Sequence, residues 1–169
     1  MNLIPSFSID HRKLKPGLYV SRIDKTGDTW ATTFDVRMKR PNVEPAIHPN
    51  AMHTIEHVVA TYLRNSEFSD KVVYWGPMGC LTGFYLIVNT EREMRPSALA
   101  PLLRRAFRHM ADYEGEVPGA TPANCGNWLL HDLPMAKWEA ARFLERKWEY
   151  RYPKTPRAKA AGGMAFYDA

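Results

Sequence analysis

Two histidines and a glutamate stand at a spacing that suits a metal ion. The run from His53 to His57 reads H-T-I-E-H and lies inside a segment, residues 51–63, whose apolar spacing predicts a helix. At about 100° per residue, His53 and His57 point within about 40° of each other, and Glu56 lies about 60° to the other side. The sequence therefore predicts one helix face with two imidazoles for a divalent ion and a carboxylate beside them. Two ordinary helix histidines next to a surface glutamate are the alternative.

A third ligand is needed, because a catalytic site usually holds its metal by three protein groups and leaves one position open. Cys125, in the run A-N-C-G-N, is the strongest candidate. A thiolate binds divalent iron or zinc well, and the glycine that follows permits a close approach. The alternative is that Cys125 is a small buried apolar residue, as free cysteines often are.

The second cysteine lies in a turn that is rich in glycine. Cys80 belongs to the run G-P-M-G-C-L-T-G, where tight turns between two predicted strands can direct a thiol into a cavity. A nearby divalent cation would stabilise the thiolate and lower the pKa of the thiol, which gives a group able to move protons at neutral pH. A structural cysteine in a hairpin turn is the alternative.

The elements that must position these residues predict an α+β fold. Asn50 is the expected N-cap of the first helix. The chain lacks a regular alternation of strands and helices, which indicates an antiparallel sheet with the helices packed on one face. The expected strands are residues 18–23, 29–38, 71–75 and 84–89, and the expected helices are residues 51–63, 97–113 and 134–150.

The predicted elements each have an apolar face, which we expect to be buried in the core, and an opposite face that carries polar side chains. On the first helix the apolar stripe lies roughly opposite the histidines, so a cleft or a partner subunit is expected to cover the histidine face. On the second strand, Asp35 and Arg37 share the face opposite the apolar residues, where the plainest interpretation is an ion pair on an exposed surface. The helix stripe consists of Met52, Ile55, Val59, Tyr62 and Leu63.

Length and composition limit the classes of protein. The chain has 169 residues, 45% of them hydrophobic, which is enough for one core and predicts a single domain over residues 1–152. No apolar run approaches the roughly 20 residues of a membrane-spanning helix, so we expect no membrane partner. Two cysteines and no secretory signal favour a cytoplasmic protein rather than a disulfide scaffold.

The net charge of +5 is concentrated near the C-terminal end. From Arg151 onward, four basic residues face a single acidic one, in a stretch that also contains prolines and an A-A-G-G run. We therefore expect residues 153–169 to be a basic extension outside the domain. Because no single element concentrates the remaining charge, a nucleic-acid partner is not expected.

Taken together, the motifs resemble those of the S-ribosylhomocysteine lyase (LuxS) family over nearly the whole chain. Each motif alone is short, but their joint order is specific. The matching runs are S-F-S-I-D-H at 6–11, F-D-V-R at 34–37, R-P-N at 40–42, H-T-I-E-H at 53–57, P-M-G-C-L-T-G at 77–83, C-G at 125–126 and L-H-D-L at 130–133.

The resemblance implies an activity. Such an enzyme cleaves S-ribosylhomocysteine to homocysteine and 4,5-dihydroxypentane-2,3-dione, the autoinducer-2 precursor of bacterial quorum sensing, within the activated methyl cycle. It also implies a homodimer with its active sites at the interface. The implied residues are His53, His57 and Cys125 for ferrous iron, which Zn²⁺ or Co²⁺ can replace; Cys80 and Glu56 for acid–base catalysis; and Ser6, His11 and Arg37 for substrate binding.

One position departs from the family, and two other functions compete. Many members have an acidic residue six positions before the catalytic cysteine, where this chain has Tyr74. The rival enzyme is an inverzincin metallopeptidase, in which Glu56 would activate water against a peptide bond. The rival without catalysis is a metal-stabilised nucleic-acid-binding module, although a structural site is more often closed by four Cys or His ligands.

Overall fold

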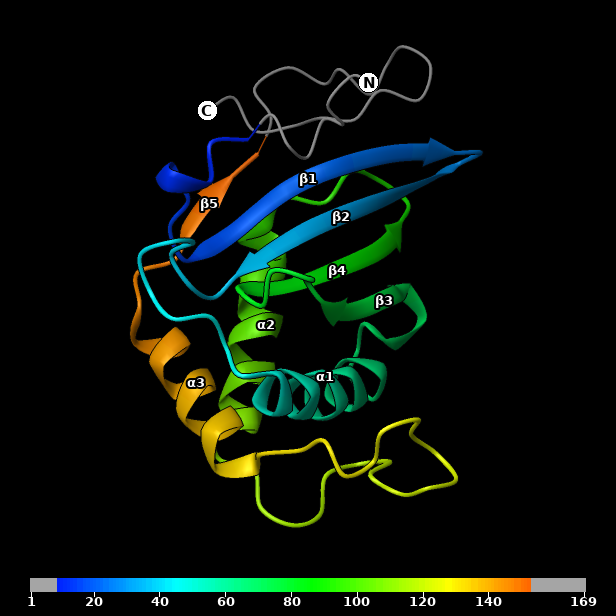
Figure 1. Cartoon of the computed structure of the whole chain (residues 1–169). Coiled ribbons are helices and arrows are strands. Elements are labelled where there is room, and N and C mark those ends of the chain that lie inside the picture. Colours follow the sequence, from blue (N-terminus) through cyan, green and yellow to red (C-terminus); the bar gives the residue numbers. More distant parts are fainter. Residues whose placement is uncertain (1–8, 153–169) are drawn as a thin grey trace, which may run out of the picture.

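A computed structural model describes residues 9–152 of the chain. They form one five-stranded sheet and three α-helices, an α+β architecture (Figure 1). In chain order the elements are η2 (His11–Lys13), β1 (Gly17–Thr26), β2 (Thr29–Arg37), α1 (Pro49–Arg64), η3 (Ser69–Lys71), β3 (Val72–Pro77), β4 (Gly83–Thr90), α2 (Pro96–Ala111), α3 (Leu133–Glu145) and β5 (Glu149–Arg151).

The sheet has the strand order β3-β4-β2-β1-β5. Neighbouring strands are antiparallel except for β1 and β5, which run parallel. The expectation of a wholly antiparallel sheet is therefore wrong at this edge, and the sheet is mixed. Gly17 makes the parallel pairing possible, because a Cβ at this position would collide with the backbone of Glu149.

The fifth strand was missed because the third helix ends earlier than its apolar spacing predicted. The helix α3 stops at Glu145 rather than near residue 150. Trp148 lies beyond the helix end, stacks on Phe143 with ring centroids 4.3 Å apart, and donates its indole N–H to the Phe143 carbonyl at 2.8 Å. This contact keeps an apolar residue in the core while the chain turns back toward β1, so helical spacing alone could not reveal the strand.

All three α-helices lie on the same side of the sheet (Figure 1). The core between these layers combines one face of the central strands with the apolar stripes of the helices. Phe34 and Val36 of β2 are fully buried there, as the alternation in that strand predicted. In α1 the predicted stripe is also confirmed, with Met52, Ile55, Val59 and Leu63 buried and Tyr62 packed against the core from its edge.

The N-cap of the helix α1 lies two residues earlier than predicted. His48 is the N-cap, and its Nδ1 accepts a hydrogen bond from the Asn50 backbone N–H at 3.4 Å. Pro49 follows as the first helical residue, where its missing N–H costs nothing and its fixed φ suits a helix. The expectation of Asn50 as the N-cap is therefore wrong, because the proline begins the helix before it.

Two sequence predictions concern residues that the structure does not describe. The basic extension over residues 153–169 lies outside the described residues, as does Ser6. Within residues 9–152, no helix combines the length and apolar character needed to cross a bilayer.

Candidate metal centre

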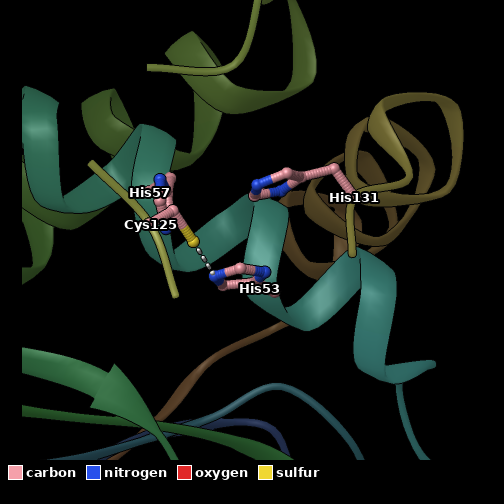
Figure 2. A group of neighbouring side chains, drawn as sticks. All are labelled: His53, His57, Cys125 and His131. Atoms are coloured by element: carbon pink, nitrogen blue, oxygen red, sulfur yellow. Dashed lines mark hydrogen bonds between the residues drawn. The ribbon is translucent and has the colours of Figure 1, made fainter. Parts of the chain in front are cut away.

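Four side chains that bind metals converge between α1 and the connection from α2 to α3. His53 and His57 come from α1, while Cys125 and His131 come from residues 112–132, which pass close to that helix (Figure 2). One ligand atom from each of the four lies within 4.8 Å of the others. The predicted residues His53, His57 and Cys125 are thus brought together, across more than 65 residues of intervening chain in the case of Cys125.

Backbone carbonyls fix the orientation of both α1 histidines. The Nδ1 of His53 donates to the carbonyl of Leu130 at 2.8 Å, and the Nδ1 of His57 donates to the carbonyl of Pro118 at 2.7 Å. Because a carbonyl can only accept, each ring carries its proton on Nδ1 and keeps a lone pair on Nε2. Gly119, with a φ of 70°, provides the left-handed turn immediately after the Pro118 carbonyl.

The sulfur of Cys125 lies 3.4 Å from Nε2 of His53. Tetrahedral coordination with ordinary metal–sulfur and metal–nitrogen bonds separates two ligand atoms by about 3.5 Å. The backbone N–H of Asn127 also points at the sulfur, 3.4 Å away. This pair of atoms therefore has the spacing of two ligands that share one ion.

His131 is the residue that sequence reasoning missed as a site residue. It was noted only as part of the L-H-D-L run, and its position six residues after Cys125 has no helical period to signal a shared site. Its ring stacks on that of His53, with centroids 4.3 Å apart. Burial, followed by the repulsion that His53 and His57 exert when they are protonated, lowers the pKa of His131 to about 4, so the ring is neutral at pH 7.

The donor set fits a divalent transition metal. Neutral imidazoles and a thiolate suit Fe²⁺, Zn²⁺ and Co²⁺ better than Mg²⁺ or Ca²⁺, which prefer oxygen ligands. The Nε2 atom of His131 is buried without a hydrogen-bond partner, which is unusual for a polar atom unless another group belongs beside it. The residues present therefore match a metal centre.

The second thiol lies in a separate cluster, formed by the turn between β3 and β4 and the end of β2. The sulfur of Cys80 is 3.1 Å from the Thr82 hydroxyl, and Nη1 of Arg37 lies 3.7 Å from the same sulfur. Arg37 also donates to the Thr82 hydroxyl at 2.5 Å and forms a two-pronged ion pair with Asp35. Cys80 thus has a cation beside it that belongs to the protein itself.

The ion pair of Asp35 and Arg37 is buried, contrary to the expectation of an exposed pair. Asp35 is 2% exposed and Arg37 is 3% exposed. The pairing itself was predicted correctly, but the outer face of β2 is covered at this end. A buried pair with several hydrogen bonds holds the guanidinium in one place, which an exposed pair would not do.

The surroundings of Cys80 lower the pKa of its thiol. Partial desolvation of the sulfur acts to raise the pKa, although the residue as a whole is exposed. The hydrogen bonds from Thr82 and the positive charge of Arg37 act in the opposite direction and together outweigh it, so the pKa falls below its usual value. The result is a thiol that ionises readily and can accept a proton.

The remaining predicted residues lie at the borders of these clusters. Glu56 is partly buried on α1, one residue before His57. His11 begins η2 in the N-terminal arm, where its Nδ1 contacts the Ile9 carbonyl at 2.9 Å. Tyr74, on the edge strand β3, is 44% exposed and lies over Gly76, where a Cβ would collide with its phenol ring.

Comparison with known proteins decides the family. The family model described as S-Ribosylhomocysteinase (LuxS) matches residues 4–153. The chain belongs to the LuxS family. The resemblance seen in the motifs is thereby confirmed.

Curated relatives of this LuxS chain share about half of its residues over nearly their whole length. The S-ribosylhomocysteine lyase of Phocaeicola vulgatus is 57% identical over 151 residues, which cover 89% of this chain and 92% of the relative. The S-ribosylhomocysteine lyases of Porphyromonas gingivalis and Clostridium beijerinckii are each 52% identical over 145 residues, covering 85% of this chain and 90% of the relative.

Proposed function

We propose that this LuxS chain is an S-ribosylhomocysteine lyase, a carbon–sulfur lyase that releases homocysteine and 4,5-dihydroxypentane-2,3-dione. The single observation that carries the proposal is the convergence of His53, His57 and Cys125, in a chain that also holds the activated thiol of Cys80. The relatives bear the same activity in their names. The dione is the precursor of autoinducer-2, which places the enzyme in quorum sensing.

The proposed metal ligands are His53, His57 and Cys125, and the proposed ion is Fe²⁺, which Zn²⁺ or Co²⁺ can replace. When bound, such an ion supplies a Lewis acid that polarises sugar oxygens. Two neutral imidazoles and a thiolate leave a divalent centre with a net charge of +1. The chain therefore keeps the centre electrophilic while it holds three ligands and leaves a position for the substrate.

Cys80 is the proposed proton carrier between carbon atoms. The reaction moves the sugar carbonyl from carbon 1 to carbon 2 and then to carbon 3, after which homocysteine leaves by β-elimination. Each carbonyl shift takes a proton from one carbon and returns a proton to its neighbour, and no oxidant or reductant is required. A thiol with a lowered pKa suits this role, because a larger fraction of it is thiolate at a given pH and it can still give the proton back.

Glu56 and three further residues complete the proposed site. The carboxylate of Glu56 moves protons to and from the sugar oxygens and protonates the leaving sulfur. Ser6 and His11 bind polar parts of the substrate. Arg37 keeps its proposed place in the substrate site, and its contacts with Cys80 and Thr82 give it a second task, which is to stabilise the Cys80 thiolate.

We propose that two copies of the chain form a homodimer and build each active site together. The metal-binding group comes from α1 and residues 112–132, whereas Cys80 comes from the turn between β3 and β4 and Arg37 from the end of β2. Exposed apolar side chains lie between Cys125 and His131 and just after His131 in the sequence, and they offer a surface for a second copy. They are Trp128, Leu129, Met135 and Trp138.

The peptidase alternative is not supported. The three relatives described above are lyases by name. A peptidase of that kind would need Glu56 and the metal but would have no use for a second, activated thiol. The two free thiols, Cys80 and Cys125, must stay reduced for the proposed chemistry, which agrees with a cytoplasmic location.

The direct test is incubation of the metal-loaded protein with S-ribosylhomocysteine while free thiol is measured with a colorimetric reagent. Thiol release above a control without substrate is expected. A metal-loaded, folded protein that releases no thiol would contradict the proposed activity.

Two cysteine variants separate the roles of the two thiols. Cys80→Ala should retain its metal and lose thiol release, because the proton carrier is gone while the ligands remain. Cys125→Ala should lose metal first and activity as a consequence, because one of three ligands is removed. Metal content by elemental analysis, beside the thiol assay, checks both. Activity in Cys80→Ala would refute the proton-carrier role of Cys80. Full metal content and activity in Cys125→Ala would refute the role of Cys125 as a ligand.

A further inference from the structure

His131 belongs to the metal-binding group but has no role in the reaction as described so far. Its ring points from the α2–α3 connection toward the other three side chains (Figure 2). The Nε2 atom is buried and has no hydrogen-bond partner. A buried polar atom without a partner is costly, so the position of Nε2 requires either an ion or a hydrogen-bond donor.

The hydrogen bonds of Thr54 decide which nitrogen of His131 carries the proton. The Thr54 hydroxyl donates its only proton to the Asn50 carbonyl at 2.8 Å and accepts the Asp132 backbone N–H at 2.9 Å. Its 3.3 Å contact with Nδ1 of His131 must then come from an N–H of the ring. Because Nδ1 carries the ring proton, Nε2 is left with a lone pair to accept a hydrogen bond.

Ring geometry argues against His131 and His53 as ligands of the same ion. An imidazole binds a metal through a lone pair in its ring plane. The rings of His53 and His131 are 14° from parallel with centroids 4.3 Å apart, so they lie face to face, and one ion cannot lie in both planes. The rings of His53 and His57 are at 90° with centroids 4.5 Å apart, so their planes cross.

The position of the Cys125 sulfur favours His53, rather than His131, as the ligand. Nε2 of His53 lies 3.4 Å from the Cys125 sulfur, the spacing expected of two ligands on one tetrahedral ion. The lone pair of His131 is left beside that ion but outside its set of protein ligands. The partner that this lone pair requires is a group that is bound to the ion and donates a hydrogen bond to Nε2 of His131.

We propose that His131 does not bind the metal ion itself but accepts a hydrogen bond from a group that is bound to the ion. With an ion held by His53, His57 and Cys125, the Nε2 atom of His131 would accept a hydrogen bond from a water before the substrate binds and from a hydroxyl of the substrate's sugar during turnover. The proposal rests on the function proposed above. It adds a residue that recognises the substrate as a polyol and orients one hydroxyl on the ion.

Two variants of His131 separate this role from metal ligation and from packing. His131→Phe keeps an aromatic ring against His53 but removes the acceptor. His131→Gln gives up the ring but places a carbonyl acceptor near the position of Nε2. The experiment loads each variant and the unchanged protein with Co²⁺, counts bound metal, records the visible spectrum without substrate, and measures kcat/KM with S-ribosylhomocysteine.

The phenylalanine variant should bind the same amount of Co²⁺ with unchanged band intensities, because the number of ligands is unchanged. Its kcat/KM should fall about 10-fold or more, as expected when a buried hydrogen bond to substrate is lost, and the glutamine variant should recover much of the loss. Lost metal or altered bands in His131→Phe would make His131 a ligand and overturn the proposal. An unchanged kcat/KM would overturn it as well.

The metal count and spectrum do not depend on the identity of the substrate. If the unchanged protein binds Co²⁺ but releases no thiol, the proposed activity fails. If the unchanged protein is active and His131→Phe is equally active, only the role of His131 fails.

Discussion

At the scale of single residues, the two thiols have different surroundings. Cys125 lies beside Nε2 of His53, where an ion would hold its thiolate. Cys80 instead relies on the protein, because Thr82 and Arg37 contact its sulfur directly. Asp35 fixes the guanidinium of Arg37 in a buried ion pair, so the charge that favours the Cys80 thiolate is present whether or not a metal is bound.

The pKa of Cys80 should therefore depend on the Thr82 hydroxyl. Alkylation by iodoacetamide follows the thiolate, so its rate rises as the pH passes through the pKa of the thiol. Thr82→Val keeps the shape of the side chain but removes a hydrogen bond to the thiolate, so the pKa of Cys80 should rise. The increase of the labelling rate with pH should therefore be shifted to higher pH than in the unchanged protein. Peptide mass spectrometry resolves labelling at Cys80 from labelling at Cys125.

Thr82→Ser is the matched control, because it keeps the hydroxyl. Its labelling profile should follow that of the unchanged protein. If Thr82→Val also follows that profile, then Thr82 does not lower the pKa of the thiol.

At the scale of elements, a helix supplies part of the metal centre and a long connection supplies the rest. The helix α1 carries two of the histidines at fixed spacing. Residues 112–132 contain no helix or strand, yet they provide Cys125 and His131 and also the carbonyls that orient the α1 histidines. Thr54 joins the two segments, because it is fully buried on α1 and accepts the N–H of Asp132 at the N-cap of α3.

Removal of this link should weaken the metal centre without removing a ligand. Thr54→Val keeps the size of the side chain but leaves Asp132 N–H and His131 Nδ1 without their partner. Metal affinity should fall about 10- to 100-fold, as is typical when groups that orient ligands are lost. Competition with a chelator of known affinity measures the change. Thr54→Ser retains the hydroxyl and should bind metal as the unchanged protein does; equal binding by Thr54→Val would contradict the role.

At the scale of the whole molecule, three helices pack on one face of a mixed sheet. In this arrangement the metal-binding group, which contains Cys125, and the cluster around Cys80 lie on different elements. The metal-binding group lies on α1 and the α2–α3 connection (Figure 2). The Cys80 cluster lies at the end of β2 and in the turn between β3 and β4. A homodimer in which each site takes Cys80 from one copy and the metal from the other would join them. Such a site is incomplete in a single chain, which is a property that can be measured.

Mixing two inactive variants tests the shared site. Cys80→Ala and His57→Ala should each lack activity, and subunit exchange should restore part of it, because one site of each mixed dimer then receives both intact clusters. Thiol release from S-ribosylhomocysteine after partial denaturation and refolding of the mixture measures the recovery.

A mixture of His53→Ala and His57→Ala is the control, because both changes affect the same cluster and no site in the mixed dimer becomes intact. Activity that returns in neither mixture, while dimers form, would show that each site is built within one chain.

The sequence by itself determined the features that depend on local spacing. The helical period placed His53, Glu56 and His57 on one face of α1, and strand alternation identified the buried face of β2. Both periods repeat within a few residues, so no knowledge of distant segments is needed. The ordered motifs also indicated the family, and the comparisons confirmed it.

Only the tertiary structure decided which distant groups meet. His131 joins the α1 histidines from 77 residues away through Thr54, and Arg37 reaches Cys80 across 43 residues. The early end of α3 and the parallel strand β5 depend on how Trp148 packs against Phe143 and on the absence of a side chain at Gly17. Such contacts follow from the packing of whole elements, which no local period encodes.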